Sequence, residues 1–176
     1  MYLNGKLYSF YLLCEQPSTT LGERYATEDD AVLYKAATVG NSYDCTFRSS
    51  MNLNNFEVKF GKDDELKHIA ELKDAINKVT SDNYKFIEDI IDVPSWLKGF
   101  AVNAVMGNYD SYNGQMAHNY YVMYNEGKMY YVGWDYNLSV GNFMDYGAAA
   151  ESDITTGLYQ ADANQRPMLT NLLAVR

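Results

Sequence analysis

Two aromatic-rich runs separated by a short turn constrain the fold of this chain more than any other feature. The first run is HNYYVMY, residues 118–124, and the second is KMYYVGW, residues 128–134. The turn Asn125-Glu126-Gly127-Lys128 reverses the chain between them. This pattern predicts a β-hairpin centred between Glu126 and Gly127, in which residue 119 faces residue 134 and residue 118 faces residue 135.

The predicted register brings polar residues to the open end of the hairpin. Asn119 begins the first strand and Asp135 follows the second, while Asp110 lies in the polar, glycine-containing loop just before the hairpin. Carboxylate and amide oxygens are hard ligands that divalent cations prefer. The sequence therefore predicts a cluster of oxygen ligands at one rigid edge.

Composition limits the class of protein. A chain of 176 residues with 47% hydrophobic and 21% charged residues is long enough for one domain with a sizeable core. No run approaches 18 apolar residues, so we expect no membrane insertion. The net charge of −9 argues against nucleic-acid binding, which needs a basic surface. The two cysteines, Cys14 and Cys45, are too few for a disulfide framework; we expect free thiols, although a single bridge stays open.

Both ends of the sequence resemble the interior of a longer protein. The chain starts at a hairpin pattern around Asn4-Gly5, without a signal peptide, and stops within an apolar helical pattern at residues 168–175. We therefore expect a fragment that is truncated at both ends.

The remaining patterns predict an α+β fold, because strands come first, helices follow and a hairpin comes after them. Strands are expected at residues 7–15 and 31–37, and loops at 16–30, with one helical turn at most, at 40–56, and for about twenty residues after Gly141. Helices are expected at residues 63–79, 84–91, 94–106 and after Arg166-Pro167. Asp92 is the expected N-cap of the third helix, and Gly107 is its end.

The order of these elements indicates a chemistry. A helix leads to a loop with Asp110, a strand begins with Asn119, and the next strand ends with Asp135. The catalytic lobe of kinases uses the same order of base Asp, metal-binding Asn, short hairpin and metal-binding Asp.

The residues also resemble a known family. GNYDSY, HNYYVMY and WDYNLSVG are similar to motifs of the CotH kinases, atypical protein kinases of bacterial spore coats and of other secreted bacterial and fungal proteins. The resemblance extends to NGKLYSFYLLCEQ, AVLYKAA, IDVPSWLKGFAVNAVMGN and RPMLTNLL, and so touches nearly the whole chain. It implies an atypical protein-kinase-like domain, mostly its catalytic lobe, located outside the cell, in the spore coat or at the cell surface.

The resemblance also implies residue roles. Asp110 takes the catalytic position, and Asp135 takes the metal position with Asn119 as a second metal ligand. Asn119 follows Asp110 by nine residues, whereas ordinary kinases place the asparagine five residues on, where this chain has Gln115. An Asx-type loop cap for Asp110 and a turn carboxylate for Asp135 are the structural alternatives.

Two further residues are candidates for nucleotide binding. Lys35 lies on a predicted strand, as the phosphate-binding lysine of kinases does, and Glu15 closes a hydrophobic strand where it can pair with such a lysine. A solvent-facing lysine and a plain edge-strand acid remain equally open. His118 is expected to orient the loop, since phosphoryl transfer needs no histidine.

The predicted activity is metal-dependent transfer of the ATP γ-phosphoryl to Ser or Thr of a protein substrate, with Mg²⁺ or Mn²⁺. Residues 1–60 are expected to contribute to the nucleotide-binding lobe and residues 61–176 to form the catalytic lobe, in one continuous domain. The sequence contains no G-x-G-x-x-G and no Walker motif. Two alternatives stay open: an inactive kinase-like module that binds surface protein or polysaccharide, and a glycoside hydrolase with Asp110 and Asp135 as its carboxylate pair.

Overall fold

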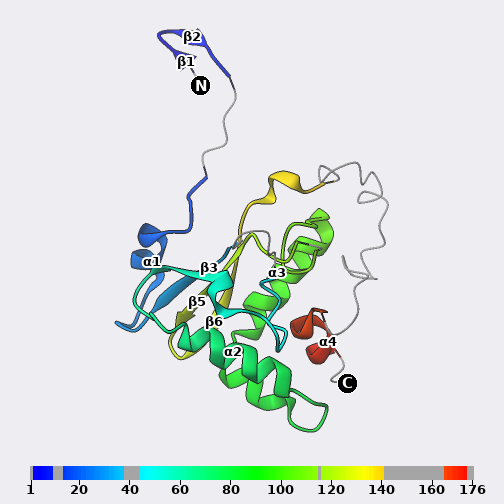
Figure 1. The fold of residues 1–176 in the computed structure, drawn as a ribbon. Helices are drawn as coiled ribbons and strands as arrows, with labels where there is room; N and C mark the ends of the chain where they lie inside the picture. Colours follow the sequence, from blue (N-terminus) through cyan, green and yellow to red (C-terminus); the bar gives the residue numbers. More distant parts are fainter. Residues whose placement is uncertain (1, 10–13, 38–43, 115, 141–164, 174–176) are drawn as a thin grey trace.

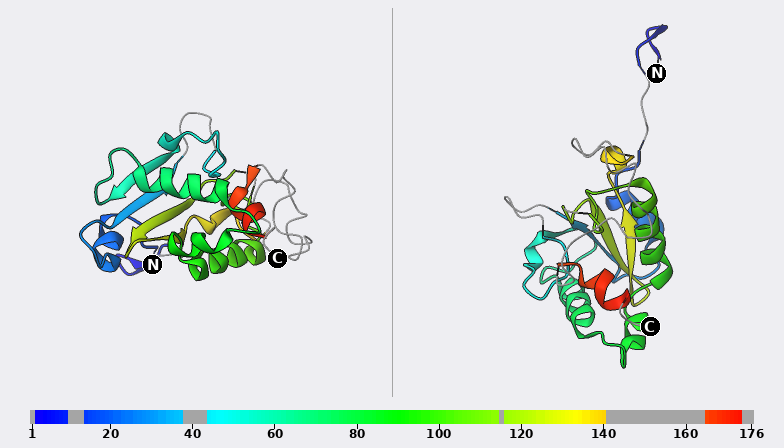
Figure 2. Two further views of the ribbon diagram at one scale, coloured as in Figure 1. Left: turned by 90° about the horizontal axis from the view of Figure 1, so that it is seen from below. Right: turned by 90° about the vertical axis from the view of Figure 1, so that its right-hand side faces the viewer.

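The fold is built on one antiparallel sheet with helices on both faces (Figures 1 and 2). The computed structural model describes residues 2–9, 14–37, 44–114, 116–140 and 165–173. The strands are β3 (Val32–Ala36), β4 (Phe56–Phe60), β5 (Tyr120–Asn125) and β6 (Lys128–Gly133), in the spatial order β4-β3-β5-β6. Strands from the first 60 residues and the hairpin therefore share one sheet. This α+β architecture confirms the predicted fold class.

Alternation along the strands sends two sets of side chains to opposite faces of the sheet. One face carries Tyr34, Tyr120 and Tyr131, which join the main core. Three helices cover this face: α2 (Lys67–Lys78), α3 (Val93–Met106) and α4 (Pro167–Leu173).

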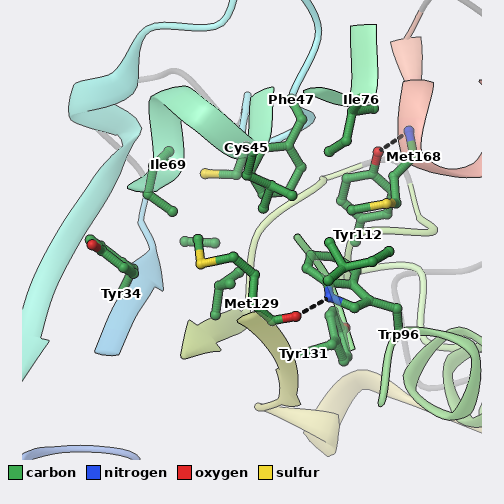
Figure 3. Close-up of a cluster of buried hydrophobic side chains, with 14 of the residues drawn as sticks. Tyr34, Cys45, Phe47, Ile69, Ile76, Trp96, Tyr112, Met129, Tyr131 and Met168 are labelled. Atoms are coloured by element: carbon green, nitrogen blue, oxygen red, sulfur yellow. Dashed lines mark hydrogen bonds between the residues drawn. The ribbon is translucent and has the colours of Figure 1, made fainter. Parts of the chain in front are cut away.

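Aromatic rings fill the centre of this core (Figure 3). Trp96 of α3 is 1% exposed, stands at 5.3 Å from the ring of Tyr131, and donates its indole N–H to the Met129 carbonyl at 2.9 Å. This hydrogen bond joins α3 to the hairpin. It also satisfies the buried N–H group of the Trp96 indole. The core thus attaches the helix that precedes Asp110 directly to the strand that precedes Asp135.

The other face carries a smaller cluster under a shorter helix. Leu33, Tyr121 and Met123 are buried there, and α1 (Thr19–Tyr25) packs against the sheet through Gly22. A side chain at Gly22 would overlap the ring of Phe60, so glycine is required for this close approach.

Local signals explain where α3 begins and ends. The Asp92 carboxylate accepts a hydrogen bond from the Ser95 amide at 2.9 Å, and Pro94 occupies the first turn. Gly107 ends the helix in the left-handed conformation at φ 60°. Both predicted boundaries are confirmed.

Several other predicted elements differ in extent. The strand expected at 7–15 is reduced to β2 (Lys6–Leu7), which pairs with β1 (Tyr2–Leu3); the other described residues of that range are irregular. Helix α2 starts at Lys67 rather than at residue 63, because Leu66 adopts a left-handed conformation at φ 53°. The expected helix at 84–91 is the 3₁₀ segment η2 (Tyr84–Asp89).

The predicted loops also require correction. Strand β4 was not predicted; it follows a short 3₁₀ turn, η1 (Leu53–Asn55), at the end of the loop expected at 40–56. Residues 16–30 hold the two turns of α1 rather than one. The loop expected after Gly141 lies outside the described residues. The helix expected after Arg166-Pro167 is confirmed as α4.

The remaining observations concern the thiols and the membrane. Cys14 is exposed and Cys45 buried, and both are free, as expected. Across the described part of the chain, no helix has both the length and the apolar character needed to cross a bilayer.

Candidate functional site

The hairpin has the predicted register. Tyr120 faces Gly133, and Asn125 faces Lys128. Glu126 and Gly127 both have positive φ, 52° and 74°, as a two-residue type I′ turn requires. Asn119 and Asp135 therefore flank the open end of the hairpin in the order that the sequence predicted.

A buried amide network holds the loop before the hairpin. The Asn103 side chain in the last turns of α3 donates to Asn113 Oδ1 at 3.2 Å and to the Tyr131 hydroxyl at 2.9 Å. Asn108 accepts from the Asp110 amide at 3.3 Å through its side-chain oxygen. All three asparagines are buried, so each lost hydrogen bond would leave a polar group without water. These asparagines were not predicted as parts of the site, although Asn108 lies within GNYDSY, because their burial comes from tertiary packing.

Arg166 ties the far end of the same loop to α4. Its side chain is 3% exposed and donates to the carbonyls of Tyr112, at 2.8 Å, and Gly114, at 2.6 Å. The Tyr112 hydroxyl in turn accepts from the Met168 amide at 3.0 Å (Figure 3). The Arg-Pro motif therefore supports the Asp110 loop by binding its backbone.

Gly114 allows the loop to close on itself. A Cβ atom at this position would overlap the backbone of Tyr109, which is not a flexible group that can move aside. We expect Gly114→Ala to cost about 1–3 kcal/mol of unfolding free energy, the range typical of overpacking. It should also displace Asp110 and reduce any activity of the site.

Thermal unfolding of the variant checks the first expectation, and an assay of the site checks the second. Gly127→Ala is the matched control, because no atom lies within 4 Å of its Cβ position and the cost is only the positive φ of 74°. Unchanged stability and activity in Gly114→Ala would show that the loop can rearrange freely.

Asp110 is buried at the centre of the site. Its side chain accepts a hydrogen bond from the Asn119 amide nitrogen at 2.7 Å, and His118 Nδ1 lies 3.1 Å from its other carboxylate oxygen. The residue is 5% exposed. Among the described residues no loop amide donates to this carboxylate, while the Asn108 side chain accepts from the Asp110 amide, so the described contacts do not favour the Asx-cap alternative.

His118 and Asn119 reach Asp110 because the chain enters β5 in an unusual conformation. Ala117 and Asn119 both have left-handed φ values, 48° and 53°. His118 Nδ1 also lies 3.1 Å from the Asp110 carbonyl oxygen, which agrees with the expected orienting role. Both side chains thus fix the direction of the carboxylate.

The pKa of Asp110 is raised above that of an ordinary aspartate. The main cause is burial, which disfavours the charged form, and the negative charge of Asp135 adds to it. The positive charge of His118 and the hydrogen bond from Asn119 oppose the rise. A carboxylate with a raised pKa is a better proton acceptor near neutral pH.

This raised pKa predicts a measurable effect on stability. The folded protein binds the Asp110 proton more tightly than the unfolded chain does. The protonated carboxyl therefore makes its full contribution to the free energy of unfolding below the pKa of an unfolded aspartate, about 3.9. This contribution is lost as the pH rises through the raised folded-state pKa. We therefore expect Asp110→Asn to increase the melting temperature at neutral pH, and to lose this advantage at acidic pH.

Melting curves of the two proteins across this pH range check the expectation. Asp64→Asn is the control, because Asp64 is exposed and lies before α2. A melting temperature of Asp110→Asn that stays below that of the unaltered protein at every pH would contradict it.

Asp135 is placed differently from Asp110. It adopts a left-handed conformation, φ 60°, directly before the 3₁₀ turn η3 (Tyr136–Leu138), and its side chain is half-buried. None of the described residues donates a hydrogen bond to its carboxylate. Gly133, two residues earlier, lies against the Tyr136 hydroxyl, where a side chain would collide. The carboxylate at the strand end is thus held by backbone conformation and remains available to a ligand.

The donor set fits a divalent cation that also binds a ligand. Asn119 directs its nitrogen at Asp110, and its side-chain oxygen accepts no hydrogen bond from the described residues. The Asn119 side-chain oxygen and the Asp135 carboxylate are therefore hard oxygen ligands, and the Asp110 carboxylate is close enough for the charge of Asp135 to act on it. Within the described parts of the chain no three His, Cys, Asp or Glu side chains converge on one point. Such a set suits Mg²⁺, which protein sites bind through one or two carboxylates plus phosphate oxygens and water.

The structure does not bring Lys35 and Glu15 together. Glu15 is exposed and forms an ion pair with Arg24 at 2.7 Å. Lys35 lies on β3 opposite Tyr121, one strand away from the end of the hairpin, and forms no ion pair with the described residues. The pairing of Glu15 with Lys35 is therefore wrong, while nucleotide binding by either residue stays a prediction.

The fold and the site are compatible with a kinase-like domain: a loop after α3 with a buried aspartate, followed by a hairpin that ends at a second aspartate. A comparison with family models agrees, because the model described as CotH kinase protein matches residues 1–175. The chain therefore belongs to the CotH kinase family. A comparison with curated proteins gives no match.

Proposed function

We propose that this domain is a metal-dependent protein kinase that transfers the γ-phosphoryl group of ATP to Ser or Thr residues of a protein substrate. The observation that carries the proposal is the buried Asp110 carboxylate, oriented by Asn119 and His118 and close enough to Asp135 for that charge to raise its pKa. Membership in the CotH kinase family supports it. The family resemblance further suggests a substrate outside the cell, in a spore coat or at a cell surface.

Asp110 and Asp135 have distinct roles in this proposal. Asp110 orients the substrate hydroxyl and accepts its proton, for which its raised pKa suits it. Asp135 and the side-chain oxygen of Asn119 hold Mg²⁺ or Mn²⁺. The metal ion, when bound, neutralises the charge of the ATP phosphates. The protein itself positions the reacting groups, and it excludes water from Asp110 by burying this side chain.

The surrounding residues keep Asp110 oriented during the reaction. Asn119 and His118 each bind one carboxylate oxygen, so the group cannot rotate freely. Arg166 and the buried asparagines hold the loop backbone against α3 and α4. Catalysis of phosphoryl transfer depends mainly on such positioning, because the protein takes little part in the covalent chemistry.

The alternative is an inactive kinase-like binding module. The observation in its favour is the lack of a glycine-rich phosphate loop in the 176 residues. An assay of labelled phosphate transfer from ATP, with Mg²⁺ or Mn²⁺, onto the protein itself and onto candidate protein substrates separates the two. Transfer that depends on the metal and on both aspartates supports the kinase. ATP binding without transfer, or binding of glycans without ATP binding, supports the module.

A further inference from the structure

A second site lies at the turn end of the hairpin, far from Asp110. A cavity of about 420 Å³ opens there between α2, the η2 segment and the hairpin. The residues that define its character are His68, Glu71, Asp74, Phe86, Tyr124 and Met129. Because β5 is six residues long, the cavity is about 20 Å from the open end of the hairpin, at roughly 3.3 Å per residue. No part of the proposed phosphoryl transfer uses it.

One wall of the cavity is acidic. Glu71 and Asp74 project from the same side of α2, and both are exposed. On the solvent side, Glu71 forms an exposed ion pair with Lys67, whose nitrogen lies 3.8 Å away, and such exposed pairs contribute little to stability. Among the described lining residues, Lys78 is the one lysine or arginine. The wall can therefore accept one additional positive group.

The floor of the cavity is aromatic and apolar. His68 and Tyr124 stack with their ring centres 3.6 Å apart and their planes 11° apart, and Phe86 and Met129 continue this surface. His68 Nδ1 is buried and has no hydrogen-bond partner among the described residues. Glu71 Oε2 is 3.6 Å from it, too far for a hydrogen bond. This nitrogen is closed to solvent, so the His68 ring contributes aromatic surface to the cavity rather than a hydrogen bond.

We propose that this cavity binds the side chain of an arginine presented by a peptide segment of a partner protein. A guanidinium group is planar and stacks on aromatic rings, and it donates several hydrogen bonds in one plane to carboxylates. It can therefore engage Glu71 or Asp74 and stack on the His68–Tyr124 surface at the same time. An anion is disfavoured by the two carboxylates, and a bare metal ion by the lack of three converging ligands among the described residues.

The test uses the whole domain without ATP and a short peptide with one arginine flanked by glycines. Binding is followed by amide chemical shifts of Ala75 and Gly127, which line the cavity. The matched peptides carry citrulline, which has the same shape without the charge, or lysine, which has the charge without the planar fork. We expect the arginine peptide to bind more than about tenfold tighter than citrulline, a difference of about 1.4 kcal/mol, and also tighter than lysine.

Protein variants locate the site. Glu71→Gln and Asp74→Asn should each weaken arginine binding several-fold, whereas Glu23→Gln, the same charge change on the exposed surface of α1, should not. Equal binding of the arginine and citrulline peptides, or equal weakening by Glu23→Gln, would overturn the proposal. Because no phosphoryl transfer is measured, this outcome is independent of the roles of Asp110 and Asp135.

Discussion

Replacing Asp135 with alanine should abolish metal-dependent binding of ATP. Its half-buried carboxylate accepts no hydrogen bond from the described residues and stands at the end of β6, where it can contribute a metal ligand. Loss of a residue that only supports a metal ligand typically lowers metal affinity 10–100-fold, so loss of the ligand itself should exceed about 100-fold. Titration calorimetry with ATP and Mg²⁺ or Mn²⁺ measures this change directly.

The control for this experiment is Asp64→Ala, which removes an exposed carboxylate before α2 and should leave ATP binding unchanged. A second readout guards against misfolding: the Asp135→Ala protein should unfold cooperatively, because Asp135 makes no hydrogen bond in the described structure. If ATP still binds to Asp135→Ala with a full metal requirement, the metal role of Asp135 is wrong.

Replacing Asp110 with alanine should have the second large effect, on transfer rather than on binding. General acid–base catalysis typically contributes about 10²–10⁴-fold to a rate, and we expect a loss of this size in the rate of phosphate incorporation. ATP affinity should remain close to that of the unaltered protein, since Asp110 is 5% exposed and its oxygens are bound to Asn119 and His118. The measurement pairs labelled phosphate transfer with calorimetry on the same preparation.

Asp110→Asn refines this experiment, because it preserves the shape of the side chain and an oxygen that can accept from Asn119. Equal loss of transfer in the alanine and asparagine variants, with ATP binding intact, points to the missing carboxylate rather than to a displaced loop. Normal transfer in either variant would show that Asp110 is not the base. Loss of ATP binding in both would instead move Asp110 into the nucleotide site.

Much of the site could be predicted because its parts are local. The hairpin register depends on a turn of two residues with positive φ and on strict alternation, both of which are visible in the sequence. The cap of α3 at Asp92 and its end at Gly107 follow from local chemistry in the same way. The confirmed register therefore places Asn119 and Asp135 on either side of the open end of the hairpin, while their metal role stays a prediction.

The elements that prediction missed depend on distant partners. Strand β4 exists because it pairs with β3 across a bulge between Leu33 and Tyr34, and its own sequence, FEVKF, was too short to stand out. The expected strand at 7–15 has high β propensity, yet the described strand β2 contains only Lys6 and Leu7, paired with β1, because β propensity depends strongly on the tertiary context. Glu15 likewise binds Arg24, nine residues away, rather than Lys35.

The sequence by itself determined the order of Asp110, the hairpin and Asp135, because residues 110–135 are connected by short-range geometry. Only the tertiary structure decided that Asp110 is buried, which of its oxygens Asn119 and His118 bind, and that its pKa is raised. It also showed that Arg166, 54 residues beyond Tyr112, holds the loop from behind. Burial and long-range hydrogen bonds come from the packing of α3, α4 and the sheet around the loop, and no local pattern encodes that packing.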